Sequence, residues 1–176
     1  MDFLWTDTLS NVQSHAPVRL SPSWRLMLMG DCSPTRNLQL LVEGEISVDL
    51  LSMQPVGRSQ LPSLSNSNEL ASPLLRRQIL KHHGRQTLMW AESFWNQQTA
   101  QEHLHEQTQS IFHNLRRDRV ELLREIDVLG QVQDKWLQEY FGQKPPFWYR
   151  LYRLFKAGQV LTVIQEVYSP VVESYF

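Results

Sequence analysis

The segment WYRLYRLFKAGQVLTVIQEVYS, residues 148–169, decides the fold class. Its two halves, Trp148 to Lys156 and Gln159 to Ser169, are rich in valine, leucine, isoleucine, tyrosine and phenylalanine, which favour strands. Ala157 and Gly158 stand between the halves, and a two-residue connection of this kind is typical of a tight hairpin. The segment therefore predicts two antiparallel strands.

A second hairpin and one further strand are predicted toward the N-terminus. Leu74 to Lys81 and Thr87 to Trp95 have the composition of strands, and they flank the sequence His-His-Gly-Arg at 82–85, which has the length of a hairpin loop. Glu45 to Ser52 alternates in part between apolar and polar residues, which is the period of a half-buried strand. Strands therefore cluster in hairpins along the chain.

Short helices are predicted between these strands. Ser33 followed by Pro34 is typical of a helix start, and this helix would run through Val42. Between Gln97 and Gly142 the pattern is helical in places, whereas Val120 to Leu129 fits neither the helical nor the strand period. Hairpins with helices between them indicate an α+β fold with an antiparallel sheet.

The composition is that of a single folded domain covering residues 1–176. With 176 residues, 41% of them hydrophobic and 20% charged, the chain is not a disordered, collagen-like or coiled-coil protein. Residues 1–20 precede the patterned region and are interpreted as an N-terminal extension. Gln54 to Pro73 is rich in proline and serine, which predicts a long surface loop.

Charge balance and cysteine content exclude several function classes. The chain has 17 lysine and arginine residues against 18 aspartate and glutamate residues, so no strong field draws it to nucleic acid or to an anionic membrane surface. Cys32 is the only cysteine, and no segment approaches the roughly 20 apolar residues that span a bilayer. We therefore expect a cytoplasmic protein without a nucleic-acid partner and without a membrane span. We also expect a monomer whose partner is a small molecule.

No local motif for nucleotide, phosphate, zinc-protease or serine-hydrolase chemistry is present in the sequence, so any active site must be assembled from scattered residues. The sequence EHLHE at 102–106 comes nearest to a metal cluster, but histidines two positions apart point to different sides of a helix. We interpret it, like the basic run RRDR at 116–119, as a solvated polar face, and we interpret His82 and His83 as exposed turn residues. Neither a metal nor a cofactor is expected.

Two charged residues interrupt otherwise apolar strand patterns. Arg77 shares a strand face with Leu75 and Ile79, and Glu166 lies in Leu161 to Tyr168, which is nearly apolar on both faces. Because burying an unpaired charge costs several kcal/mol, each residue is either paired or functional. A functional arginine can bind a carboxylate through two hydrogen bonds, and a functional carboxylate can accept a proton or a hydroxyl hydrogen bond. The alternative is that the two form a structural ion pair or reach the rim of the sheet.

The chain resembles the chorismate lyase family, the chorismate pyruvate-lyases, and most of all its branch from oxygenic phototrophs. Five short stretches carry this resemblance, and in their order and spacing they cover most of the chain from Trp24 onward. They are WRLML at 24–28 with Asp31 and Ser33-Pro34-Thr35, LRRQIL at 75–80, AES at 91–93, FWYR at 147–150, and Leu161 to Pro170 with its end EVYSP.

This resemblance implies both a fold and an activity. The fold would be a single antiparallel sheet flanked by helices, with the ligand in an internal cavity. The activity would be the conversion of chorismate into 4-hydroxybenzoate and pyruvate without a cofactor. The product would supply the aromatic head group of a prenylated quinone, such as plastoquinone or ubiquinone.

The resemblance also implies site residues. The active-site arginine of the family falls on Arg77 and its glutamate on Glu166, so Arg77 would bind the ring carboxylate, and Glu166 would contact the ring hydroxyl or act as general base. Two substrate-binding positions fall on Pro34 and Ile111. Proline has no N–H group to donate, so Thr35 is expected to take over that contact.

Two alternative functions remain open at this point. A similar fold serves as the effector-binding half of some bacterial transcription regulators, so the chain could be a non-catalytic sensor of a hydroxybenzoate-like ligand. The matching region starts at Trp24, which leaves too few residues before it for the winged-helix module of such regulators. A lyase that releases a different hydroxybenzoate isomer is the other alternative.

Overall fold

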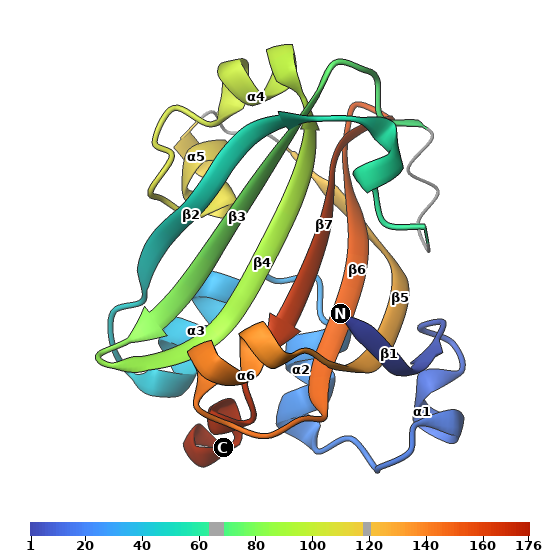
Figure 1. Ribbon diagram of the computed structural model, residues 1–176, viewed down its shortest axis with the longest axis vertical. Helices are drawn as coiled ribbons and strands as arrows, with labels where there is room; N and C mark the ends of the chain where they lie inside the picture. Colours follow the sequence, from blue (N-terminus) through green and yellow to red (C-terminus); the bar gives the residue numbers. More distant parts are fainter. Residues whose placement is uncertain (64–68, 118–120) are drawn as a thin grey trace.

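The computed structural model describes residues 1–63, 69–117 and 121–176, and these form an antiparallel sheet flanked by helices (Figure 1). In this part of the chain the sheet has seven strands in the order β1-β5-β6-β7-β4-β3-β2. The strands are β1 (Asp2–Asp7), β2 (Ser47–Val56), β3 (Leu74–His83), β4 (Gln86–Asn96), β5 (Leu123–Gln133), β6 (Phe147–Lys156) and β7 (Gln159–Tyr168). The predicted α+β class with one antiparallel sheet is confirmed.

The helices are short, and none within the described ranges is long and apolar enough to cross a membrane. The predicted helix after Ser33 is α3, and the Ser33 hydroxyl accepts a hydrogen bond from the N–H of Arg36 at its first turn. The helices are α1 (Val12–His15), α2 (Pro22–Met29), α3 (Pro34–Val42), α4 (Gln97–His103), α5 (Ile111–Arg117) and α6 (Lys135–Phe141), with short 3₁₀ turns at Arg58–Gln60 and Pro170–Tyr175.

Both predicted hairpins form. Ala157 and Gly158 join β6 to β7 with φ values of 49° and 78°, the left-handed conformation that a two-residue hairpin turn needs at both positions. The turn between β3 and β4 is shorter than predicted, because His82 and His83 belong to β3. His82 is therefore not an exposed turn residue: its Nε2 lies 3.1 Å from Asp49 of the neighbouring strand β2.

Two further strands were not predicted. Residues 1–20 were interpreted as an extension, but β1 pairs with β5 at the edge of the sheet. Strand β5 covers most of Val120 to Leu129, the segment that fits neither the helical nor the strand period. Its pairing with β6 shifts between Ile126 and Val128. An extra residue at such a bulge moves the alternation to the other face, so the two halves of β5 are out of phase.

The predicted surface loop starts later than expected. Strand β2 continues through Val56, so Gln54 to Val56 belong to the sheet rather than to the loop. The connection to β3 contains the 3₁₀ turn at Arg58–Gln60, and residues 64–68 of the predicted loop lie outside the described residues.

Side chains alternate along the strands, so the two faces of the sheet are covered by different helices. On one face, Trp90 and Phe94 of β4 pack against Leu137 and Phe141 of α6. The opposite face carries two hydrophobic clusters, one beneath α2 and α3 and one that includes residues of α4 and α5. In Figure 1 the helices α2 and α3 lie behind the sheet and α6 lies in front of it. The space between the two clusters is where the candidate site forms.

Candidate functional site

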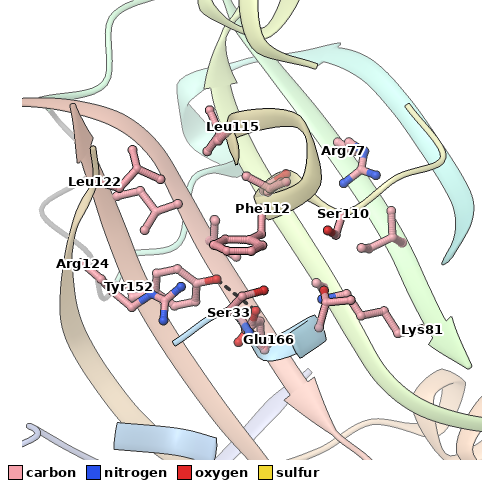
Figure 2. Close-up of a pocket in the computed structure, with 18 residues that line it drawn as sticks. Ser33, Arg77, Lys81, Ser110, Phe112, Leu115, Leu122, Arg124, Tyr152 and Glu166 are labelled. Atoms are coloured by element: carbon pink, nitrogen blue, oxygen red, sulfur yellow. Dashed lines mark hydrogen bonds between the residues drawn. The ribbon is translucent and has the colours of Figure 1, made fainter. Parts of the chain in front are cut away.

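A cavity lies between the sheet and the helices α3 and α5 (Figure 2). Strands β3, β4, β6 and β7 supply its floor, while α3, α5 and the start of β5 supply its walls. The residues that line it are Ser33, Pro34, Thr35, Arg77, Ile79, Lys81, Ala91, Ser93, Ser110, Ile111, Phe112, Leu115, Leu122, Arg124, Tyr152, Leu154, Ile164 and Glu166. All five residues singled out from the sequence, Arg77, Glu166, Pro34, Thr35 and Ile111, face this one cavity.

Small side chains on β4 make the space. Ala91 lies opposite Ile79 of β3 on one side and opposite Glu166 of β7 on the other. Ser93 lies opposite Arg77 of β3 on one side and opposite Ile164 of β7 on the other. A larger side chain at either β4 position would fill the gap between the two outer strands.

The enclosed space is narrow. Its volume is about 50 Å³, which is enough for a few water molecules but less than the ~150 Å³ void that holds benzene in another protein. An outer hollow of about 600 Å³ shares Thr35, Ser110 and Phe112 with the cavity. Phe112 therefore lines both spaces, and the inner one is too narrow for a benzenoid ligand in this conformation.

Glu166 is buried and its carboxylate accepts hydrogen bonds from three side chains. It is 2% exposed, and its Oε2 accepts hydrogen bonds from Arg150 Nε at 2.9 Å and from the Tyr168 hydroxyl at 2.7 Å. The Tyr152 hydroxyl donates to Oε1 at 3.0 Å. The other guanidinium nitrogen of Arg150 that faces the carboxylate, Nη2, lies 2.9 Å from Oε2. The ion-pair partner of Glu166 is therefore Arg150 of the neighbouring strand β6, not Arg77.

This environment keeps Glu166 ionised. Burial alone would raise the pKa of the carboxyl, but the charges of Arg150, Lys81 and Arg124 and the hydrogen bond from Tyr168 outweigh it, so the pKa of Glu166 lies below its ordinary value. The same pairing raises the pKa of Arg150 in spite of its burial. A carboxylate of this kind holds a hydrogen-bond donor well but is a weak base.

Arg77 lies at the other end of the cavity and holds its cover in place. Its side chain is 1% exposed; Nε and Nη2 donate to the carbonyl oxygen of Gln107 at 3.2 and 2.7 Å, and Nη2 also donates to that of Gln109 at 2.7 Å. Burial lowers the pKa of Arg77 to about 10, which leaves it charged at neutral pH. The residues before α5 thus depend on Arg77 for their position.

The ends of two helices complete the walls. Pro34 and Thr35 form the first turn of α3, which presents its N-terminus to the cavity. Ile111 begins α5, and Ser110 before it accepts a hydrogen bond from the N–H of His113 through its hydroxyl. Because the first N–H groups of a helix have no partner within the helix, both ends offer donors to an anion.

Sequence reasoning missed further cavity residues. Lys81 continues the face of Arg77 and Ile79 along β3, so the strand period alone could have pointed to it. Arg124 lies in the strand that no period predicted, and its Nη1 donates to the carbonyl oxygen of Cys32 at 2.6 Å. Its guanidinium also stacks on the Tyr152 ring, 4.7 Å from the ring centre.

The other sequence candidates lie elsewhere. The EHLHE segment is not a solvated helix face throughout, because His103 is buried at the end of α4 and its Nε2 lies 3.0 Å from Lys156 Nζ. Nowhere in residues 1–63, 69–117 and 121–176 are three histidine, cysteine, aspartate or glutamate residues grouped so that they could hold a metal ion. The side chains of the basic run at 116–119 lie outside the described part of the structure.

Comparison with known proteins gives a family match over most of the chain. Residues 28–176 match the family described as chorismate pyruvate-lyase Rv2949c-like. The uncharacterized protein ycf21 of Cyanophora paradoxa is 27% identical over 151 residues, which cover 85% of this chain and 78% of that protein.

Solved structures with a similar fold include a possible transcriptional regulator and an effector domain, both from bacteria. The effector domain of PhnF from Mycobacterium smegmatis has a TM-score of 0.60 at 10% sequence identity and covers 79% of this chain and 89% of that domain. The possible transcriptional regulator YydK from Bacillus subtilis has a TM-score of 0.52 at 17% identity, and the match covers 70% of this chain and 57% of that one. At such low identity the likeness shows the fold alone.

Proposed function

Because the chain belongs to the chorismate pyruvate-lyase family described as Rv2949c-like, we propose that it converts chorismate into 4-hydroxybenzoate and pyruvate in the cavity beneath α3 and α5. The observation that carries this proposal is the charge of the cavity lining. Arg77, Lys81 and Arg124 face it, and the charge of Glu166 is already balanced by Arg150 behind it. Chorismate is a small dianion with one carboxylate on its ring and one on its enolpyruvyl group, so an enclosed, positively charged site suits it.

Arg77 would bind the ring carboxylate of chorismate. Its nitrogens Nε and Nη2 hold the cover through three hydrogen bonds, and in the described part of the chain Nη1 makes no hydrogen bond to protein, so it is available to a ligand. The N–H of Ile111 at the start of α5 would add a second donor. At α3, Pro34 has no N–H, so the N–H or hydroxyl of Thr35 would supply the contact on that side.

Glu166 would hold the ring hydroxyl. Its Oε1 accepts one hydrogen bond, from Tyr152, and a carboxylate oxygen can accept a second. The lowered pKa of Glu166 favours this role over removal of the ring proton. The apolar walls strengthen both polar contacts, because they keep water away from them.

The reaction itself is an elimination. The ether C–O bond between the ring and the enolpyruvyl group breaks, and the oxygen leaves with that group as enolpyruvate. The ring carbon that bears the hydroxyl loses its proton, and the methylene carbon of enolpyruvate takes up a proton to give pyruvate, so that no net proton is gained or lost. The electron pair of the broken C–H bond completes the aromatic ring of the product, which drives the reaction. We further propose that this product supplies the head group of a prenylated quinone such as plastoquinone.

Purified protein is expected to consume chorismate and to release 4-hydroxybenzoate and pyruvate in equal amounts. Ultraviolet absorption follows the loss of chorismate, and chromatography identifies the hydroxybenzoate isomer. The product itself should raise the melting temperature, because a ligand at 100 times its dissociation constant stabilises the fold by about 2.7 kcal/mol, or about 5 to 10 °C for a chain of this size.

The likeness to regulator effector domains favours a second candidate, a sensor that binds a hydroxybenzoate-like ligand without converting it. The same experiment separates the two functions. Chorismate that stays intact in the presence of a protein stabilised by 4-hydroxybenzoate would support the sensor and contradict the lyase. Release of the 2- or 3-hydroxy isomer would support a lyase of another product.

Filling the cavity floor should abolish ligand binding while the fold persists. Ala91→Leu places three extra carbon atoms between β3 and β7, in a space of about 50 Å³. We expect the melting-temperature shift with 4-hydroxybenzoate to disappear and kcat/KM to fall at least about tenfold, with a stability change of about 1–3 kcal/mol. Ala100→Leu is the matched control, because Ala100 is equally buried in α4 but does not line the cavity. Equal loss of binding in both variants would contradict the assignment of this cavity.

A further inference from the structure

Lys81 is a buried cation in the cavity with no direct protein partner in the described residues. Its side chain is 4% exposed and lines the cavity floor. No hydrogen bond or ion pair to its ammonium group is seen in residues 1–63, 69–117 and 121–176. A buried ammonium without a partner is costly, so this position is informative.

The surrounding charges do not neutralise Lys81. Burial lowers the pKa of Lys81 to about 8, and Glu166 opposes this only in part because Arg77, Arg150 and Arg124 act in the opposite direction. The carboxylate of Glu166 is itself paired with Arg150. Lys81 thus keeps a positive charge at neutral pH that an anion inside the cavity would compensate.

Two other cations at or behind the cavity wall are engaged with protein groups, which sets Lys81 apart. Arg124 donates to the carbonyl oxygens of Cys32 and Gly30, and Arg150 donates to the carbonyl oxygen of Met27 at the end of α2 as well as to Glu166. Arg77, Lys81 and Arg124 line the cavity, and of these three only Lys81 makes no hydrogen bond to the described part of the protein. All of its donors are therefore free for a ligand.

The position of Lys81 suits a molecule that carries two carboxylates. Arg77 and Lys81 lie four residues apart on the same face of β3, so their Cα atoms are about 13 Å apart. Ile79 lies between them on this face, and it pairs with Ala91 of β4, which in turn pairs with Glu166 of β7. Along the strand direction, Glu166 is therefore level with the middle of the interval between Arg77 and Lys81. Figure 2 shows Arg77 at one end of the cavity and Lys81 at the other, on the side of Glu166. Two long side chains at this spacing can approach both ends of one small dianion.

The chemistry of chorismate distinguishes these two ends. Its hydroxyl is opposite the ring carboxylate, and the enolpyruvyl ether is on the ring carbon next to the hydroxyl. With the ring carboxylate on Arg77 and the hydroxyl on Glu166, the enolpyruvyl carboxylate must lie near Glu166. We propose that Lys81 binds this second carboxylate, an inference that rests on the lyase function proposed above.

This assignment separates the substrate from the product. 4-Hydroxybenzoate has lost the enolpyruvyl carboxylate, so it does not use Lys81. Contacts that the substrate makes and the product lacks favour release of the product after the reaction. Lys81 would therefore contribute to substrate selection and not to retention of the product.

Lys81→Met tests the inference because it keeps an unbranched side chain only one atom shorter and removes the charge. We expect kcat/KM for chorismate to fall about 30-fold, while the dissociation constant of 4-hydroxybenzoate changes less than about threefold, and Lys81→Arg to recover most of the activity. Lys156→Met, which removes a lysine at the end of β6 outside the cavity lining, is the matched control and should leave both values unchanged.

Three outcomes would overturn the inference. They are an unchanged kcat/KM in Lys81→Met, an equal loss of affinity for 4-hydroxybenzoate, and a lower melting temperature that accounts for the whole effect. If the wild-type protein binds chorismate without converting it, the lyase proposal fails by itself. The Lys81 inference is then decided by the dissociation constants of chorismate and 4-hydroxybenzoate, of which only the first should depend on Lys81.

Discussion

Arg77→Ala is expected to lower kcat/KM for chorismate by about 100- to 1,000-fold, because a desolvated carboxylate that loses its charged partner costs about 2–5 kcal/mol. The ring carboxylate would then face an apolar pocket without its guanidinium. Affinity for 4-hydroxybenzoate should fall by a similar factor, since the product keeps the same carboxylate. Steady-state kinetics and calorimetric titration with the product measure the two effects.

The second role of Arg77 has to be separated from the first. Arg77 also donates to the carbonyl oxygens of Gln107 and Gln109, so its removal loosens the cover of the cavity as well. Arg77→Lys keeps the charge but not the paired geometry, and it should keep part of the activity. The melting temperature shows how much of the loss is structural.

Arg76 gives a control from the same strand. It points to the opposite face of the sheet, where its Nε lies 3.6 Å from Glu92 and its Nη1 donates to Gln60. Arg76→Ala should therefore leave kcat/KM unchanged although it removes a neighbouring arginine. Equal activity of Arg77→Ala and the wild-type protein would rule out Arg77 as the carboxylate site.

The burial of Arg77 could be predicted because it follows from a local pattern. In a strand, residues two apart share a face, so the apolar neighbours of Arg77 in β3 place it on the covered side without any knowledge of the other strands. The hairpin turns were predictable for the same reason, because Ala157 and Gly158 take the conformations that a two-residue connection requires.

The partner of Glu166 could not be predicted, because it depends on a register shift. The turn pairs Lys156 with Gln159, and a regular hairpin would then place Arg150 opposite Gln165. A bulge between Leu154 and Phe155 shifts the pairing by one residue and brings Arg150 opposite Glu166. No residue pattern in β6 marks that bulge. The strand β5 and its Arg124 were missed because of a bulge of the same kind.

Glu166→Gln is expected to lower the stability of the protein as well as its activity. Arg150 is fully buried, and removing the charge of its carboxylate partner leaves an uncompensated cation, which costs about 3–5 kcal/mol. The melting temperature at neutral pH should fall by about 10 °C. Because the amide oxygen can still accept the ring hydroxyl, kcat/KM should fall only about 10- to 100-fold. A larger loss with product binding retained would show instead that Glu166 removes the ring proton.

The pH dependence of stability tests the ion pair independently of activity. The pKa of Glu166 is lower in the folded protein than its ordinary value of 4.5, so the pair stabilises the fold fully above that value and loses its effect as the pH falls through the lower, folded value. Urea unfolding of the wild-type protein and of Glu166→Gln should therefore differ most at neutral pH and converge in acid. A difference that does not depend on pH would contradict the charged state of Glu166.

A double variant separates the structural role of Glu166 from its role in the reaction. Glu166→Leu combined with Arg150→Met replaces the buried pair by apolar side chains, which is often neutral for stability. Recovery should be incomplete, because Arg150 also donates to the carbonyl oxygens of Met27 and Leu28 at the end of α2. The variant should be more stable than Glu166→Gln and yet inactive toward chorismate. A stable and active double variant would show that the carboxylate of Glu166 serves the fold and takes no part in the chemistry.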